Sequence, residues 1–240
     1  MPEEKEAVVE ARSQRRILLA SAYGCMLVLV GLIMVGMIPP PSAQHDPQWW
    51  LQFWGENVNL KRAGVILALI GASAIPGMVV VLSQQMRRVL GPDSAVAYVQ
   101  LATGLLGFLV FLLLPLFLWS GLTYRPGMHD PDLMQALTDL SLFPFLFPWL
   151  GIVQFIMIAI CVFKDTEGIV FPRWMGYVIL WCAVALIPGG FIYFFKSGPM
   201  AWDGILAFWV GLVAVLVAIV TLVSCLLRAL SHEPRLPTDR

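Results

Sequence analysis

One stretch decides the fold, residues 205–227, which reads ILAFWVGLVAVLVAIVTLVSCLL. It contains no Asp, Glu, Lys, Arg or His over 23 consecutive residues. An α-helix needs about 20 predominantly apolar residues to cross the hydrocarbon core of a bilayer. The stretch is therefore long enough and apolar enough to cross a membrane once as a helix.

Five more windows share this freedom from charge and have similar lengths; they are residues 17–38, 63–82, 95–119, 143–163 and 175–195. None of them shows the alternation of apolar and polar residues that marks the strands of a membrane barrel. The sequence therefore predicts an all-α integral membrane protein, a bundle of six transmembrane helices. The membrane domain covers residues 17–230, and residues 1–16 and 231–240 are short tails.

The composition of the chain agrees with a surface that meets lipid. Of the 240 residues 59% are hydrophobic and 12% are charged, and the mean hydropathy is +0.82. A soluble domain carries about 25% charged residues, which are needed to cover a water-facing surface. We therefore expect the lipid bilayer as the main partner, with no nucleic acid. The loops lack a Gly-rich phosphate-binding motif, so we expect no nucleotide either.

The distribution of basic residues predicts the orientation. If the N-terminus is cytoplasmic, the cytoplasmic segments hold eleven Lys and Arg residues and the outer loops hold four. Lys and Arg accumulate on the cytoplasmic side of membrane proteins. Both termini are therefore expected in the cytoplasm, and the short loops are typical of a bacterial plasma (inner) membrane protein.

The first two outer loops are expected to contain short amphipathic helices. Apolar residues recur there at helical spacing: Trp50, Phe53, Trp54 and Val58 in the first loop, and Leu133, Ala136, Leu137 and Leu140 in the second. Such helices lie flat at the membrane surface. Two interpretations of the first helix stay open, an aromatic lid packed on the bundle and a surface on which Trp54 contacts a ligand or partner.

A tripeptide occurs once in each of these loops, as His45-Asp46-Pro47 and as His129-Asp130-Pro131. Imidazole and carboxylate groups together suit a transition metal such as zinc, copper or iron. If the two turns converge, His45, Asp46, His129 and Asp130 would form a divalent-metal site at the outer face. The alternative is local, because an Asp-Pro pair also opens a helix. No other cofactor is expected.

The spans themselves contain few polar side chains and several helix breakers. Gln100 and Gln154 are the best candidates for contacting a ligand inside the membrane. Proline removes a backbone hydrogen bond and frees carbonyl groups that neighbours must satisfy. Internal breaks are expected at Pro76-Gly77, Pro115, Pro144, Pro148 and Pro188-Gly189-Gly190.

Three functions are compatible with these observations. The leading interpretation is a structural or accessory membrane subunit that packs against a partner protein, another copy of itself or lipid, because no catalytic constellation accompanies the charge-free spans. The alternative is a permease or channel for a neutral or apolar solute, favoured by the broken helices and the two glutamines. The third is a membrane enzyme that uses the outer-face His/Asp metal site.

Overall fold

The computed structural model describes residues 2–126, 130–168 and 170–231, with side chains from residue 8 onward. Within these ranges six helical segments are long and apolar enough to cross a membrane: Val8–Val35, Val58–Leu90, Ala95–Tyr124, Pro131–Lys164, Arg173–Phe194 and Ile205–Ser231. The prediction of a multi-pass helical membrane protein is thereby confirmed, and the outer faces of these helices imply contact with lipid.

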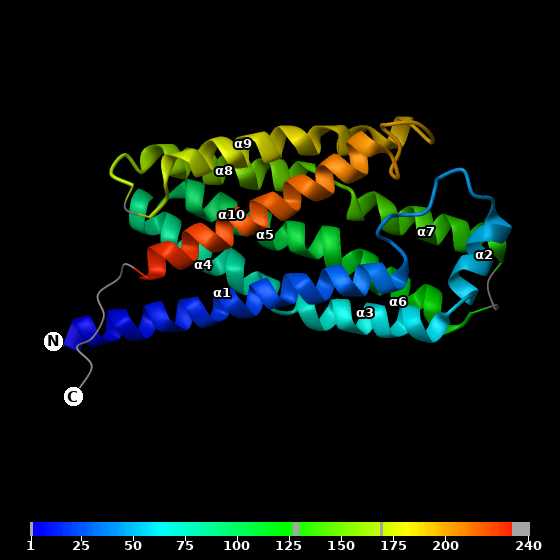
Figure 1. Cartoon of the computed structure of the whole chain (residues 1–240), viewed down its shortest axis with the longest axis horizontal. Coiled ribbons are helices and arrows are strands. Elements are labelled where there is room, and N and C mark those ends of the chain that lie inside the picture. Colours follow the sequence, from blue (N-terminus) through cyan, green and yellow to red (C-terminus); the bar gives the residue numbers. More distant parts are fainter. Residues whose placement is uncertain (1, 127–129, 169, 232–240) are drawn as a thin grey trace.

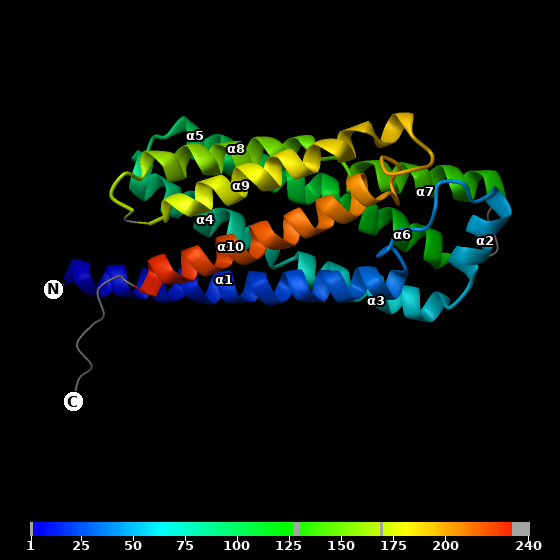
Figure 2. The same cartoon turned by 45° about the horizontal axis from the view of Figure 1, so that its top comes forward.

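The segments lie side by side along the long axis of the molecule (Figures 1 and 2). Helix α1 (Pro2–Val35) begins at the end of the bundle where α10 (Gly211–Ser231) finishes. The turns that follow α4 (Ile75–Leu90) and α8 (Trp149–Lys164) lie at the same end, which we call the terminal end. The short helix α2 (Pro47–Gly55) lies across the opposite end, which we call the α2 end.

Helix α1 packs most closely against α3 (Val58–Ala72), which runs antiparallel to it. Two pairs of glycines face each other across this contact, Gly24 with Gly71 and Gly31 with Gly64. A Cβ atom on Gly31 would lie 2.5 Å from the carbonyl oxygen of Gly64. Small residues let helix backbones approach closely in membranes, so this pair of helices depends on glycine at the contact.

The second span breaks between α3 and α4, just before the Pro76-Gly77 pair. The hydroxyl of Ser21 on α1 donates hydrogen bonds to the carbonyl oxygens of Ala74 (2.6 Å) and Ile17 (3.0 Å). The carbonyl of Ala74 at the break also accepts a long 3.3 Å bond from the backbone N–H of Gly77. It thus receives a second, shorter bond from a neighbouring helix, which lipid cannot supply.

The other predicted breaks also change the local helix. In the third span α5 (Ala95–Phe108) and α6 (Leu114–Tyr124) are joined by a π-helix, η1 (Leu109–Leu113), directly before Pro115. In the fourth span α7 (Pro131–Phe145) contains Pro144 and ends before Pro148, after which α8 begins. The sixth span opens with a second π-helix, η3 (Ile205–Val210).

The fifth span changes from α9 (Arg173–Leu186) to a 3₁₀ helix, η2 (Ile187–Phe194), at the Pro188-Gly189-Gly190 sequence. A 3₁₀ helix is narrower and rises about 2.0 Å per residue, so the 22 residues of this segment reach further than an α-helix of the same length would. The break therefore lengthens the span as well as bending it.

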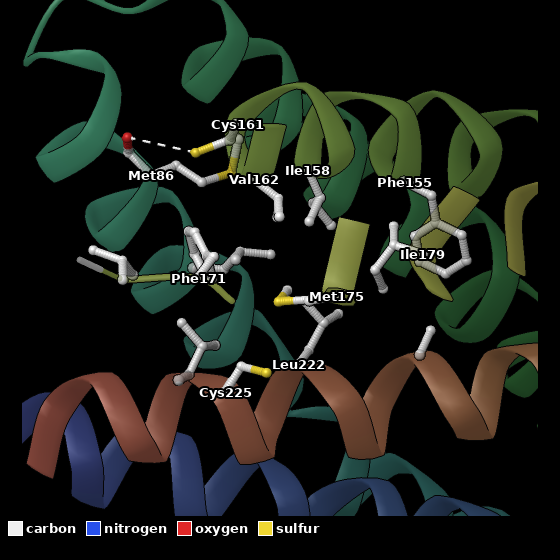
Figure 3. Packing of buried hydrophobic residues seen from close by; sticks show 14 of the residues in the cluster. Met86, Phe155, Ile158, Cys161, Val162, Phe171, Met175, Ile179, Leu222 and Cys225 are labelled. Atoms are coloured by element: carbon white, nitrogen blue, oxygen red, sulfur yellow. Dashed lines mark hydrogen bonds between the residues drawn. The ribbon is translucent and has the colours of Figure 1, made fainter. Parts of the chain in front are cut away.

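Two hydrophobic clusters hold the bundle together. The first joins α4, α8, α9 and α10 toward the terminal end, where Met86, Cys161, Phe171 and Met175 are fully buried (Figure 3). The thiol of Cys161 lies 3.9 Å from the carbonyl oxygen of Met86. The second cluster lies toward the α2 end and is built around three fully buried tryptophans, Trp50, Trp54 and Trp119.

Candidate functional site

A buried amide side chain stands out among the polar groups of the spans. Gln100 on α5 is 0% exposed, and neither its Nε2 nor its Oε1 atom has a hydrogen-bond partner in the described part of the chain. Its main-chain carbonyl, by contrast, accepts a hydrogen bond from Thr103 Oγ1 at 3.2 Å. Burying an amide in an apolar medium without a hydrogen bond costs about 2–7 kcal/mol. Gln100 is therefore a polar group that the folded chain itself does not satisfy.

The second glutamine of the spans lies on the facing helix. Gln154 on α8 is half-buried, and its Nε2 atom lies 2.9 Å from the position that a Cβ atom on Gly104 would occupy. The same position is 2.5 Å from Cγ1 of Val79 on α4. Gly104 is one helical turn beyond Gln100 on α5, so both predicted ligand-contacting glutamines border the region where α4, α5 and α8 meet.

Two other buried polar side chains of α4 have partners inside the chain. Ser83 Oγ donates to the carbonyl oxygen of Ala97 at 3.2 Å, which connects α4 with α5. Gln85 Nε2 donates to Gln14 Oε1 at 2.7 Å, which connects α4 with α1. Gln100 differs from them, since both of its polar atoms lack such a bond. Such an uncharged amide, with one donor and one acceptor atom, can bind a neutral group that both donates and accepts a hydrogen bond.

Trp54 lies in the interior of the α2 end. Its side chain is 0% exposed, and its Nε1 donates a 2.8 Å hydrogen bond to Thr138 Oγ1 on α7. Trp119 on α6 makes the corresponding bond to Ser141 Oγ, also at 2.8 Å. The indole group of Trp54 is thus occupied in fixing α2 to α7.

The first His-Asp-Pro turn works locally as the beginning of α2. The imidazole of His45 stacks on the indole of Trp49, with 3.6 Å between the ring centroids. Asp46 is exposed, and its Oδ1 accepts a 2.7 Å hydrogen bond from the backbone N–H of Trp49. Asp46 therefore caps the helix, and Pro47 fills the first helical position, where no N–H donor is needed.

The second turn begins α7 in the same way. Asp130 Oδ1 accepts hydrogen bonds from the backbone N–H groups of Asp132 (2.9 Å) and Leu133 (3.4 Å), and Pro131 follows it. His129 lies outside the described residues, so its approach to His45 stays a prediction. Among the residues that the structure does describe, no three His, Cys, Asp or Glu side chains are grouped so as to hold a metal ion.

A polar chain at the terminal end was not foreseen from the sequence. Arg88 Nη1 donates to Gln85 Oε1 at 2.7 Å, and Gln14 Nε2 donates to Glu10 Oε1 at 3.0 Å. With the Gln85–Gln14 bond these contacts join four side chains from α4 to the first turns of α1. The sequence signal that could have indicated this contact is the helical spacing of Val8, Ala11, Gln14 and Leu18. All four are buried on one face of α1.

Exposed aromatic side chains form a continuous face on α9. Trp174, Tyr177 and Trp181 recur at helical spacing, and Trp181 is 72% exposed. Helix α9 runs along one edge of the bundle (Figure 1). Trp174 and Tyr177 are also more than half exposed, although the Tyr177 ring contacts Phe163 of α8. We call these three residues the aromatic face of α9. The sequence shows their spacing, but their exposure depends on which side of α9 packs against α8 and α10.

No protein-family model, no curated protein and no solved structure matches this chain.

Proposed function

We propose that this chain is an accessory membrane subunit that works by packing against another membrane protein through the aromatic face of α9. The observation that carries the proposal is Trp181, which is exposed 72% at membrane depth. It follows Arg173 by eight residues, which corresponds to about 12 Å along the helix axis. Trp181 therefore lies well below the headgroup level that tryptophan prefers at a lipid surface.

A protein partner suits this position better than lipid does. Tryptophan and tyrosine are enriched in the cores of protein interfaces, where each ring buries a large area at little cost in conformational entropy. An indole N–H that is removed from water usually finds an acceptor, and lipid chains offer none. A neighbouring transmembrane helix can present one from a Ser or Thr hydroxyl or from a backbone carbonyl at a helix break. The expected partner is therefore a helix with such a group.

The contacts at the α2 end support the same proposal. Three residues predicted from the sequence to bind a ligand or metal lie at this end and stabilise the fold. Trp54 binds Thr138, and Asp46 and Asp130 cap helices. Their polar atoms are engaged within the chain. A packing role uses none of these groups and needs only the outward face of the bundle.

The proposal includes an orientation in a plasma membrane with both termini cytoplasmic. It is supported by the eleven-to-four distribution of Lys and Arg, and by the position of the α1 start and the α10 end on one side of the bundle. The aromatic face of α9 then lies in the cytoplasmic half of the membrane, where its partner should make contact.

The test is a comparison of two exposed aromatic residues in mild detergent. The full chain is tagged and purified with its bound proteins, either unchanged or as Trp181→Leu or Tyr23→Leu. Tyr23 is 67% exposed on α1, away from α9, and serves as the matched control. We expect Trp181→Leu to lose the co-purifying protein at least tenfold, while Tyr23→Leu retains it. A photo-crosslinking amino acid at position 181 should capture the same protein.

Three results would decide against or refine this assignment. A chain that is monomeric and without any partner in several mild detergents contradicts it, and so does equal recovery of the partner with both variants. A crosslinked product at twice the 26.6 kDa of one chain makes the partner a second copy. Circular dichroism of each variant establishes that the helices are intact.

A further inference from the structure

We propose that Gln100, Gln154 and Gly104 form an intramembrane site for one small neutral molecule that can both donate and accept a hydrogen bond. Water, a polyol such as glycerol and an amide such as urea share this chemistry. The site is separate from the aromatic face of α9 and does not rest on the proposed accessory role. It adds a ligand to the interior of the bundle.

The first argument is that both polar atoms of the Gln100 amide lack a partner in the described chain. The amide is fully buried and unpaired there, whereas the buried side chains of Ser83 and Gln85 on the adjoining α4 are paired. Polar groups at membrane depth are retained where they bind one another or a ligand. The Gln100 amide presents one oxygen and two N–H groups for such a contact.

The second argument is the clearance at Gly104. A Cβ atom at this position would lie 2.9 Å from the amide nitrogen of Gln154 and 2.5 Å from the side chain of Val79. Any larger residue would therefore displace the amide of Gln154 from the surface of α5. Glycine at position 104 keeps a second uncharged amide beside the helix that carries Gln100.

The third argument concerns the size and charge of the ligand. The windows 95–119 and 143–163, which contain the site, hold no Asp, Glu, Lys, Arg or His, so nothing there balances the charge of an ion. Complete burial of Gln100 restricts the ligand to a few heavy atoms. The π-helix η1 begins five residues after Gly104. Such segments are frequent at functional sites, and this one breaks the regular packing of α5 close to the glutamines.

The experiment observes the glutamine amides directly. The full chain is labelled with ¹⁵N on glutamine side chains and placed in lipid nanodiscs, and the Gln100 signal is identified by its loss in Gln100→Leu. Glycerol and urea are titrated separately at millimolar concentration. We expect a saturable shift of the Gln100 signal with one of them, or a magnetisation transfer from water when water is the occupant. Gln48, exposed on α2, is the internal control and should shift only linearly.

Variants show whether the shift belongs to this site. Gln154→Leu and Gly104→Ala should each abolish the saturable shift, while Gly121→Ala, where a Cβ atom meets no neighbour, should preserve it. The proposal is overturned if Gln100 shows neither a saturable shift nor contact with water, or if the response survives Gln154→Leu.

Discussion

Single atoms decide how close α1 and α3 can come. Gly24 and Gly31 on α1 each place their Cα hydrogens against a backbone carbonyl of α3, and Gly71 and Gly64 do the same in return. Even the methyl group of alanine is too large at these four glycines, because the opposing atoms belong to the backbone and cannot rotate away. The contact is therefore more sensitive to substitution than an ordinary apolar contact of the same area.

A methyl group at this contact should destabilise the protein. Gly31→Ala places a carbon 2.5 Å from the carbonyl oxygen of Gly64 and 2.8 Å from Cβ of Ala68. Overpacking of this kind costs about 1–3 kcal/mol, and we expect the free energy of unfolding to fall by that amount in a denaturing-detergent titration. Gly121→Ala in α6 adds the same methyl group in open space. It should leave stability unchanged or raise it slightly, and an equal loss in both variants would contradict the prediction.

The sequence predicts the local effect of a single residue better than it predicts which two residues contact each other. The breaks at Pro76 and Pro188 follow from the missing N–H of proline, whatever surrounds them. The pairing of Gly31 with Gly64 depends on the rotation of two helices about their axes, which a charge-free window does not encode. Gln100 and Gln154 are visible as the rare amides of the spans, whereas the burial of Gln100 depends on the packing of α4 and α8 around it.

Helix α2 is an element whose position rests on a small number of contacts. It is nine residues long, too short to be stable alone in water, and it begins with the Asp46 cap and Pro47. Two of its tryptophans are fully buried, and one of them, Trp54, is bonded to Thr138. Helix α2 is thus held across the end of the bundle by its contact with α7.

The coupling between these two helices can be measured with a double-mutant cycle. Trp54→Phe and Thr138→Val each remove one partner of the 2.8 Å hydrogen bond. We expect a coupling energy of about 0.5–1.5 kcal/mol, the net value of a typical internal hydrogen bond. Trp49→Phe paired with Thr138→Val is the control, since Trp49 stacks on His45 and lies outside this bond. A coupling energy of zero for the first pair would show that α2 is held by apolar packing alone.

Element boundaries show where sequence reasoning fails in physical terms. Each charge-free window stops at or short of the first ionised residue, but a helix continues wherever its backbone bonds can form. Helix α1 therefore begins at Pro2, since residues 2–16 are rich in Ala, Glu and Arg, which favour helix. It ends at Val35, before the three prolines, because Gly36 adopts a positive φ of 85° and closes the helix. Helix α7 similarly joins the fourth span instead of remaining a separate loop helix.

The whole molecule has two unlike ends. The terminal end contains the polar chain from Arg88 to Glu10 and the Asp165 carboxylate, which accepts hydrogen bonds of 2.8 Å from the backbone N–H groups of Val170 and Phe171. The α2 end is closed by aromatic side chains, and Trp202 Nε1 donates to the carbonyl oxygen of Pro41 at 2.8 Å. The contacts thus differ between the two ends, and the proposed orientation places the terminal end in the cytoplasm.

Labelling with a membrane-impermeant maleimide tests that orientation. Asp93→Cys and Glu167→Cys place exposed thiols in two turns at the terminal end, and Gln48→Cys places one on α2. We expect the first two to react only from the cytoplasmic side and the third only from the opposite side. The unchanged chain is the control, because its four cysteines lie inside the spans and should not react. Labelling of Asp93→Cys and Gln48→Cys from the same side would overturn the topology.

The glycine contact of α1 with α3 also sets an order of events during synthesis. Gly24 and Gly71 are 47 residues apart in the chain, and ribosomes add about 5–20 residues per second. About 2–9 s therefore pass between the synthesis of Gly24 on α1 and that of Gly71 on α3. During this time only lipid or the insertion machinery can contact the glycines of α1. Once residue 72 has entered the membrane, a two-helix hairpin can close before the later spans are complete. This hairpin offers the first protein surface on which the later helices α4, α6 and α10 pack.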